Sequence, residues 1–331
     1  IRDSGGPMNK NDWLSQMLKV ITVKGQLDAR CSYVAPWRVY CEESGGFEIP
    51  YHVVLEGRAV IQDKNKKTWN ELKEGDVVLV PDGSAHLLHD GSDQDTGGVS
   101  QSQSSSGWMI SENFGVGERL DMLCGRFFID PPHEQLIKSY LPKNLIISSL
   151  DIADNIYSRS TRRYLSSLLA LMRIESSEDR PGGRAVIGAL TSALFAMVLR
   201  ATTEIDTAPT GMLALASNPR LAPAISAMFN QPEHAWSLPE LAALCNMSRA
   251  TFMRHFHERL GKSANELLLD IRMSLAANRL RTLSGTTEEV ADAVGYKSVA
   301  AFRRAFTEKM GVTPGQWRRQ YLSENGKELI S

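Results

Sequence analysis

An internal repeat near the C-terminal end constrains the fold more than any other feature of this sequence. Seven positions carry the same residue in two copies that lie 50 residues apart. A solenoid needs about three or more repeats to bury a continuous core, so two copies predict a pair of similar small units instead. The matched pairs are Ser248 and Ser298, Ala250 and Ala300, Phe252 and Phe302, Arg254 and Arg304, Phe256 and Phe306, Glu258 and Glu308, and Gly261 and Gly311.

Each copy has the signals of two short helices joined by a tight turn. In the first copy Ser237 and Glu240 have the spacing of a capping box, and Ser248 precedes the second helix. The paired phenylalanines of each second helix are expected to point inward, which leaves the arginines outside. Matching signals in the second copy are Thr286, Glu289, Gly295 and Ser298.

A long helix is predicted between the two copies, beginning at Ser263 and Glu266. Its length of about 18 residues corresponds to about 27 Å. A strut of that size would hold two units about one DNA turn, roughly 34 Å, apart. A last helix is predicted to begin at Thr313 and Pro314. Helix-turn-helix units with a basic second helix fit the DNA major groove, whereas a duplicated helical domain without nucleic-acid function is the alternative.

Charge supports the DNA interpretation only weakly. Residues 212–331 carry a net charge of +4, and residues 1–211 carry a net charge of −5. This modest asymmetry permits a DNA-binding C-terminal part without requiring one.

The C-terminal part resembles the AraC/XylS type of transcription regulator domain, which contains two helix-turn-helix units. The resemblance covers residues 236–320 and implies sequence-specific DNA binding. It is carried by WSLPELA at 236–242, MSRATF at 247–252, RM at 272–273 with AA at 276–277, VA at 290–291, VGYKS at 294–298, AFRRAF at 301–306 and GVTPGQWR at 311–318.

The same resemblance places the residues that read base edges on the second helix of each unit. Arginine can pair bidentately with guanine, while serine and threonine can contact bases or phosphates. Phosphate contacts are expected from His255, Lys262 and Arg318. The predicted base readers are Ser248, Arg249, Thr251, Met253 and Arg254 in the first unit, and Lys297, Ser298, Val299, Ala300, Arg303 and Arg304 in the second.

The N-terminal half has the pattern of a β-sandwich or barrel. Between residues 12 and 130, short β-prone runs such as 51–55, 59–61 and 76–80 alternate with turn residues. Residues 89–107 are rich in serine, glycine and glutamine, so we expect a flexible insertion between two strands.

One spacing in this half resembles the second cupin motif: Gly75, Pro81, Gly83 and His86. The segments around 51–57 and 123–127 resemble the cupin-type sensor that precedes AraC-like domains. The positions where cupin enzymes place two histidines and a glutamate hold other residues here. This lowers the expectation of a cupin-fold metal enzyme with a helical accessory domain, which is the alternative function. The substituted positions are Ser44, Gly46 and Pro50.

Two histidines are predicted to meet inside the barrel. His52 shares strand parity with Pro50 and therefore faces the interior, where it would approach His86, with His89 or a cysteine nearby. Such a pair could bind Zn or Cu, although two ligands make a weak site. Structural core histidines held by hydrogen bonds are the alternative.

Four widely spaced cysteines argue against a disulfide scaffold and for reduced thiols. Some regulators of the subgroup that this chain resembles respond to reactive chlorine or other electrophiles through thiols. Under that resemblance Cys31 and Cys124 are the redox residues expected here.

The predicted fold class is α+β with several domains: an N-terminal cupin-like β-barrel, a helical linker, and a C-terminal all-α domain with two helix-turn-helix units. The expected boundaries are 1–14 for an N-terminal tail, 15–142 for the barrel, 143–210 for the linker, 211–322 for the DNA-binding domain and 323–331 for a C-terminal tail. The linker helices either form a dimer interface or pack on the barrel.

The predicted function is that of a one-component transcription regulator and not an enzyme. Its expected partners are double-stranded DNA, RNA polymerase, a small-molecule, metal or oxidant effector and a second copy of the chain. The sequence shows neither an N-terminal secretory signal nor a run of about 18 consecutive apolar residues, so we expect a cytoplasmic protein without a membrane partner. An architectural DNA binder without an effector is a further alternative.

Overall fold

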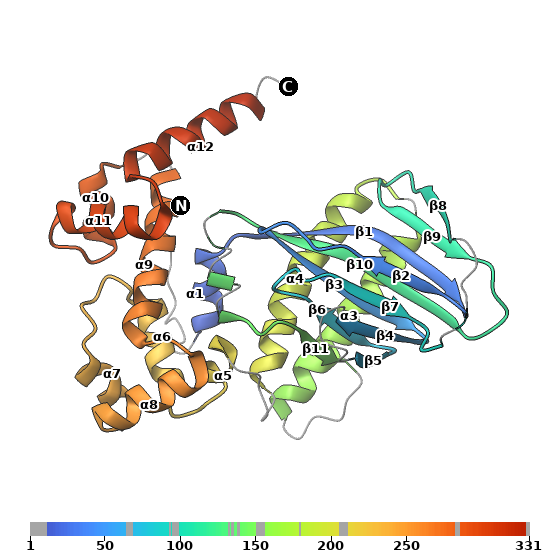
Figure 1. The fold of residues 1–331 in the computed structure, drawn as a ribbon, viewed down its shortest axis with the longest axis horizontal. Helices are drawn as coiled ribbons and strands as arrows, with labels where there is room; N and C mark the ends of the chain where they lie inside the picture. The colour runs from blue at the N-terminus through green and yellow to red at the C-terminus, as the bar shows by residue number, and fades with distance from the viewer. Residues whose placement is uncertain are drawn as a thin grey trace. The chain divides into compact units, whose positions relative to one another are not determined.

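The computed structural model divides into two compact units, Val23–Pro209 and Ile1–Thr22 with Thr210–Ser331 (Figure 1). Within the chain it describes residues 12–63, 69–92, 94, 99–131, 133, 136–137, 140–149, 156–178, 180–204, 211–281 and 285–328.

Two β-sheets form the body of the first unit (Figure 1). The seven-stranded sheet has the order β11-β6-β3-β10-β1-β9-β8, and the four-stranded sheet has the order β2-β7-β4-β5. All pairings are antiparallel except β1 with β9. The strands are β1 (Val23–Val34), β2 (Arg38–Cys41), β3 (Glu48–Glu56), β4 (Arg58–Asp63), β5 (Trp69–Lys73), β6 (Asp76–Leu79), β7 (His86–His89), β8 (Val99–Gln103), β9 (Met109–Asn113), β10 (Arg119–Ile129) and β11 (Leu145–Ser148).

The barrel core lies between the two sheets because alternate residues of each strand point to opposite faces. Val54 and Met122 from the large sheet share one buried cluster with Ile61 and Leu88 from the small sheet. Strand β3 is buried along nearly its whole length, since its other face is covered as well. This double coverage explains why 51–55 is a nearly continuous apolar run.

Two long helices, α3 (Ile156–Ser177) and α4 (Gly183–Thr203), belong to the same unit as the sheets. Helix α4 packs on the large sheet. The rings of Phe127 and Phe195 are 5.0 Å apart, and the hydroxyls of Tyr51 and Thr191 are 3.4 Å apart. The apolar face of α4 is therefore explained by its packing on the barrel and not by a role as a linker between two domains. The boundary expected at 142/143 differs from this grouping, and Leu145–Ser148 is a strand where the sequence indicated helix.

By length and hydropathy alone, α4 could cross a membrane, and it is the one such helix among the described residues. Its apolar character has a simpler cause, because its residues Ile187, Leu194, Phe195 and Val198 are buried within the folded unit.

The second unit is helical and includes the N-terminal helix α1 (Trp13–Val20), which the expected boundary at residue 15 divided between a tail and the barrel. The Trp13 ring lies 6.2 Å from that of Phe229, and Asn278 donates a 2.6 Å hydrogen bond to the carbonyl of Val20. The other helices are α5 (Met212–Ala216), α6 (Ala222–Asn230), α7 (Leu238–Leu244), α8 (Arg249–Leu260), α9 (Ala264–Arg281), α10 (Thr287–Ala293), α11 (Val299–Met310) and α12 (Pro314–Glu328), which runs into the segment expected to be a C-terminal tail.

The insertion at 89–107 is more ordered than the sequence indicated. Its residues Val99–Gln103 form strand β8, which pairs with β9 at the end of the large sheet while all five residues remain exposed. The backbone pairing of β8 with β9 orders this segment, and amino-acid composition alone does not predict such pairing. Residues 93 and 95–98 of the insertion lie outside the described part of the chain.

Gly25 is predicted to be essential to the packing of α4 on β1. A Cβ added at Gly25 would lie 2.8 Å from the backbone nitrogen of Ser192, whereas one added at Gly45 would meet nothing within 4 Å. Gly25→Ala should therefore destabilise the protein by about 1–3 kcal/mol through overpacking, measured by scanning calorimetry of the full chain. Gly45→Ala is the matched control, and equal melting of the two variants would contradict the close approach.

Candidate functional site

The second compact part of the chain, which is helical, contains both predicted helix-turn-helix units. The first consists of α7 and α8, and the second of α10 and α11. Both predicted capping boxes form, at Ser237 with Glu240 and at Thr286 with Glu289. The first turn contains Asn246 with φ 50°, and the second contains Gly295 with φ 81°. Both φ values lie in the left-handed region, which Asn and Gly tolerate better than other residues.

The paired phenylalanines form the cores of these units, as predicted. Phe252 and Phe256 are fully buried with ring centroids 5.3 Å apart, and Phe302 and Phe306 are buried with centroids 5.6 Å apart. Their burial fixes the opposite face of α8 and α11 toward solvent.

That solvent face holds most of the predicted DNA contacts. Arg254 lies 3.9 Å from Glu258, and Arg303 lies 3.6 Å from Glu288, as exposed ion pairs that contribute little to stability and leave the arginines free to exchange partners. The half-buried predicted contacts are Thr251, His255, Lys262, Val299 and Arg318. The exposed ones are Ser248, Arg249, Met253, Arg254, Lys297, Ser298, Ala300, Arg303 and Arg304.

Three predicted contacts also have structural roles. The hydroxyls of Ser248 and Ser298 accept hydrogen bonds from the backbone of Thr251 and Ala301 and so cap α8 and α11. Arg318 donates a 2.8 Å hydrogen bond to the carbonyl of Gly285, which ties α12 to the segment before α10.

Helix α9 lies between the two helix-turn-helix units in the chain (Figure 1). Arg272, near the middle of α9, contacts both of them. Its guanidinium donates to the carbonyls of Pro232 and His234, at 2.6 and 2.8 Å, in the segment before α7. It also lies 5.9 Å from the Tyr296 ring in the second turn. Arg272 therefore positions both units. Arg272 belongs to the RM motif at 272–273, but the sequence does not indicate this role, because the partners of Arg272 lie 40 and 38 residues away.

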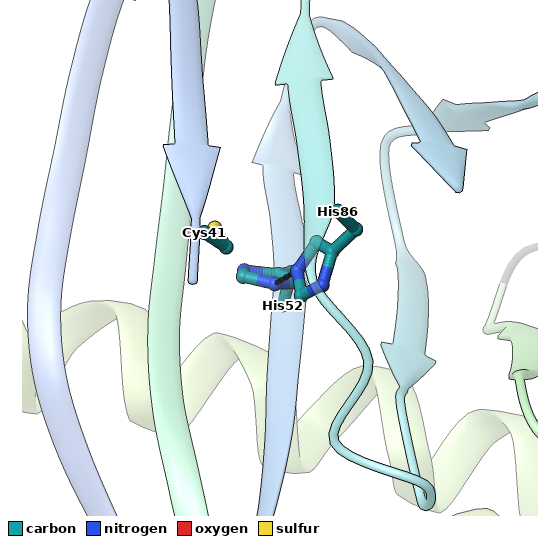
Figure 2. A group of neighbouring side chains, drawn as sticks. All are labelled: Cys41, His52 and His86. Carbon is teal, nitrogen blue, oxygen red and sulfur yellow. Dashed lines mark hydrogen bonds between the residues drawn. The ribbon is translucent and has the colours of Figure 1, made fainter. Parts of the chain in front are cut away.

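A cluster of sulfur and imidazole groups lies in the barrel, and Figure 2 shows three of its members, Cys41, His52 and His86. Cys41 of β2 is paired in register with His86 of β7, and His52 of β3 with Cys124 of β10. The first pair belongs to the small sheet and the second to the large one. His52 and His86 meet as predicted, with their Nε2 atoms 2.8 Å apart.

The hydrogen bonds determine which nitrogen of each neutral ring carries the proton. Nδ1 of His86 lies 2.8 Å from the carbonyl of Ser84, which only accepts, so Nδ1 is protonated and Nε2 is an acceptor. Nε2 of His52 therefore donates to His86. Nδ1 of His52, 3.1 Å from Sγ of Cys124, is then left to accept from the thiol.

The surroundings keep the two imidazoles neutral. Burial, followed by the neighbouring His86, lowers the pKa of His52 to about 3, and burial lowers the pKa of His86. Burial is also the main cause that raises the pKa of Cys41 to about 12.

The two predicted redox cysteines are neighbours, with sulfurs 3.8 Å apart. The side-chain hydrogen bond between Cys31 and Cys124 is the main cause that lowers the pKa of Cys31. That same bond, followed by burial, raises the pKa of Cys124. The thiolate is therefore favoured on Cys31.

His89 does not take part in the cluster. It lies at the other end of β7, where its Nδ1 accepts a 3.1 Å hydrogen bond from the backbone of Gly91. Cys41 takes the place expected for His89 or an unspecified cysteine. No local pattern could have identified Cys41, because its position depends on the pairing of β2 with β7.

The ligand set of a cupin metal enzyme does not form here. Of the four positions in that set, Pro50 offers no side-chain ligand and Gly46 has no side chain. The other two positions hold Ser44 and His86. Among the described residues, Cys41, His52 and His86 are the group whose donor atoms converge, all within 4.8 Å of one another.

Comparison with known proteins places the chain in a family. The model of a cupin family matches residues 12–204, more than half of the chain, and a helix-turn-helix domain model matches residues 241–320. The chain therefore belongs to that cupin family.

Relatives align over nearly the whole chain, each covering 93% of it and 98% of the relative. An uncharacterized HTH-type transcriptional regulator of Haemophilus influenzae is 26% identical over 309 residues. The HTH-type transcriptional regulator MtrA of Neisseria gonorrhoeae is 28% identical over 312 residues, and the RCS-specific HTH-type transcriptional activator RclR of Escherichia coli is 24% identical over 309 residues.

The stability of the protein should depend on pH through His52. The unfolded chain takes up a proton at His52 near pH 6.5, whereas the folded protein resists protonation down to about pH 3. The unfolding free energy should thus fall as the pH decreases through this window, by at most about 1.4 kcal/mol per pH unit. Denaturant unfolding with a chelator present should show a shallower slope for His52→Gln. Identical slopes in the wild type and in His52→Gln would contradict the burial of a neutral His52.

Proposed function

We propose that this protein is a one-component transcription regulator that binds operator DNA through both helix-turn-helix units. The observation that carries the proposal is the pair of matching helices, α8 and α11, whose arginine-bearing faces are exposed while their phenylalanine faces are buried. Helix α9, with 18 residues, spans about 27 Å, which suits two neighbouring entries into one major groove.

The similar proteins support this function, since the relatives described above are named as transcription regulators. On the same basis we place the protein in the cytoplasm and expect RNA polymerase as its partner at the promoter. A homodimer is supported by the exposed apolar residues of α3, which are Tyr164, Leu171 and Ile174.

The barrel is proposed to sense an oxidant through Cys31 and Cys124, consistent with the name of the E. coli relative. The Cys31 thiolate attacks the chlorine of hypochlorous acid and forms a sulfenyl chloride, with release of hydroxide. The Cys124 thiol then displaces chloride and loses a proton, giving a disulfide. Two thiols are oxidised by two electrons, and chlorine is reduced to chloride.

Disulfide formation would alter the sheet on which α4 packs. The two sulfurs are 3.8 Å apart on the adjacent strands β1 and β10, and a disulfide bond is about 2.05 Å long. The two side chains, together with the strands that carry them, must therefore rearrange, and this rearrangement is the proposed signal. A cupin-fold enzyme is less well supported, since Ser44, Gly46 and Pro50 stand where its metal ligands would be.

Arg304 is predicted to read a base. Arg304→Ala should cost about 1–3 kcal/mol in affinity and relax the preference at one base position. The measurement is a gel-shift titration on a duplex selected from random DNA with the wild-type protein, followed by a single-base substitution series. Arg220→Ala, an exposed arginine outside both recognition helices, is the control. An Arg304 variant with unchanged affinity and base preference would remove this residue from the readers.

Hypochlorous acid is predicted to change the affinity for the same duplex by about 5- to 150-fold, the usual range of allosteric coupling. Cys31→Ser and Cys124→Ser should each abolish the response, because either substitution prevents the disulfide. Cys245→Ser, which removes a buried thiol of the helical unit, should respond like the wild type. A response that persists in the Cys31 and Cys124 variants would show that the signal arises elsewhere.

A further inference from the structure

We propose that Cys41, His52 and His86 form a binding site for a thiophilic d¹⁰ cation, Zn²⁺ or Cu⁺, inside the barrel. Their donor atoms all lie within 4.8 Å of one another, and both histidines are buried (Figure 2). One sulfur and two imidazole nitrogens are a donor set that suits these two ions and discriminates against Mg²⁺ and Ca²⁺. This assignment goes beyond DNA binding and thiol oxidation and depends on neither.

The hydrogen bond of His86 to Ser84 supports this site. A histidine that binds a metal usually donates its other ring N–H to a carbonyl or carboxylate, which fixes the ring orientation. Nδ1 of His86 already donates to the Ser84 carbonyl at 2.8 Å, so its Nε2 lone pair points into the cluster.

Cys124 is excluded from the first ligand shell by the geometry of His52. Its sulfur contacts Nδ1 of His52, on the edge of the ring opposite to the Nε2 atom that faces His86. The described part of the chain therefore supplies three ligands. Three ligands are enough for trigonal Cu⁺, while tetrahedral Zn²⁺ would add a water molecule as the fourth ligand.

Binding would rearrange protons and side chains in a defined way. The Cys41 thiol releases its proton to solvent, because the thiolate is the form that binds a metal. A cation on Nε2 of His52 displaces the proton that this atom donates to His86, so the neutral ring must carry its proton on Nδ1. Nδ1 then donates to Cys124 instead of accepting from it. The two Nε2 atoms, now 2.8 Å apart, must separate to about 3.3 Å to bind one tetrahedral ion at about 2.05 Å each.

The ion would also link the two sheets. Cys41 and His86 belong to the small sheet and His52 to the large sheet. The site would replace one hydrogen bond between the sheets by three metal–ligand bonds.

The test is metal binding by the purified, reduced full-length chain under anaerobic conditions. Equilibrium dialysis against Zn²⁺, and separately against Cu⁺ held by a competing chelator, should give one ion per chain for at least one cation. Cys41→Ala and His86→Ala should each weaken binding by more than about 100-fold, since even the loss of an outer-shell partner costs about 10- to 100-fold. His89→Ala and Cys245→Ser are the matched controls and should bind like the wild type.

Loading with Co²⁺ tests the ligands directly. A sulfur-to-cobalt charge-transfer band should appear in the wild type and be lost in Cys41→Ala, whose thermal unfolding is measured in parallel to show that it folds. The absence of binding by both cations, or equal affinity in the wild type and in the Cys41 and His86 variants, would overturn the proposal. DNA affinity, measured on the same samples, separates this outcome from a failure of the regulator function.

Discussion

The hydrogen bonds from Arg272 to the carbonyls of Pro232 and His234 determine how the two helix-turn-helix units are held on α9. The same guanidinium faces the turn of the second unit, where a Cβ on Gly295 would lie 2.9 Å from its Nη2 atom. The turn can approach this closely only because residue 295 is glycine. Spacing between the reading helices is thus set by a polar contact as well as by the length of α9.

The barrel depends on a comparable polar contact between its two sheets. His52 and His86 are buried among apolar side chains, and an unpaired polar group there would cost about 1–3 kcal/mol. Each ring nitrogen has a partner, in a series that runs from Ser84 through both imidazoles to Cys124. A change at one end of this series, by oxidation or by a bound cation, alters the donors and acceptors along it.

Helix α4 contacts the same strands of the barrel that carry the two predicted redox cysteines. Strands β1 and β10 carry Cys31 and Cys124 on the inner face of the large sheet, while Gly25 and Phe127 of the same strands contact α4 on the outer face. The thiols and the residues that contact α4 therefore lie on opposite faces of the same two strands, so the oxidation proposed above would act next to this closely packed helix contact.

The sequence alone determined the features that depend on local pattern. Capping boxes, the turn at Gly295, the buried phenylalanines and the inward parity of His52 follow from spacing, since helices and strands have fixed periods. Contacts between distant segments required the tertiary structure. Cys41 lies next to the histidines because β2 pairs with β7. Arg272 donates to a carbonyl 40 residues away. Helix α4 packs on the barrel through the contact between Phe195 and Phe127. Such contacts depend on strand order and on packing, and neither of these produces a periodic pattern in the sequence.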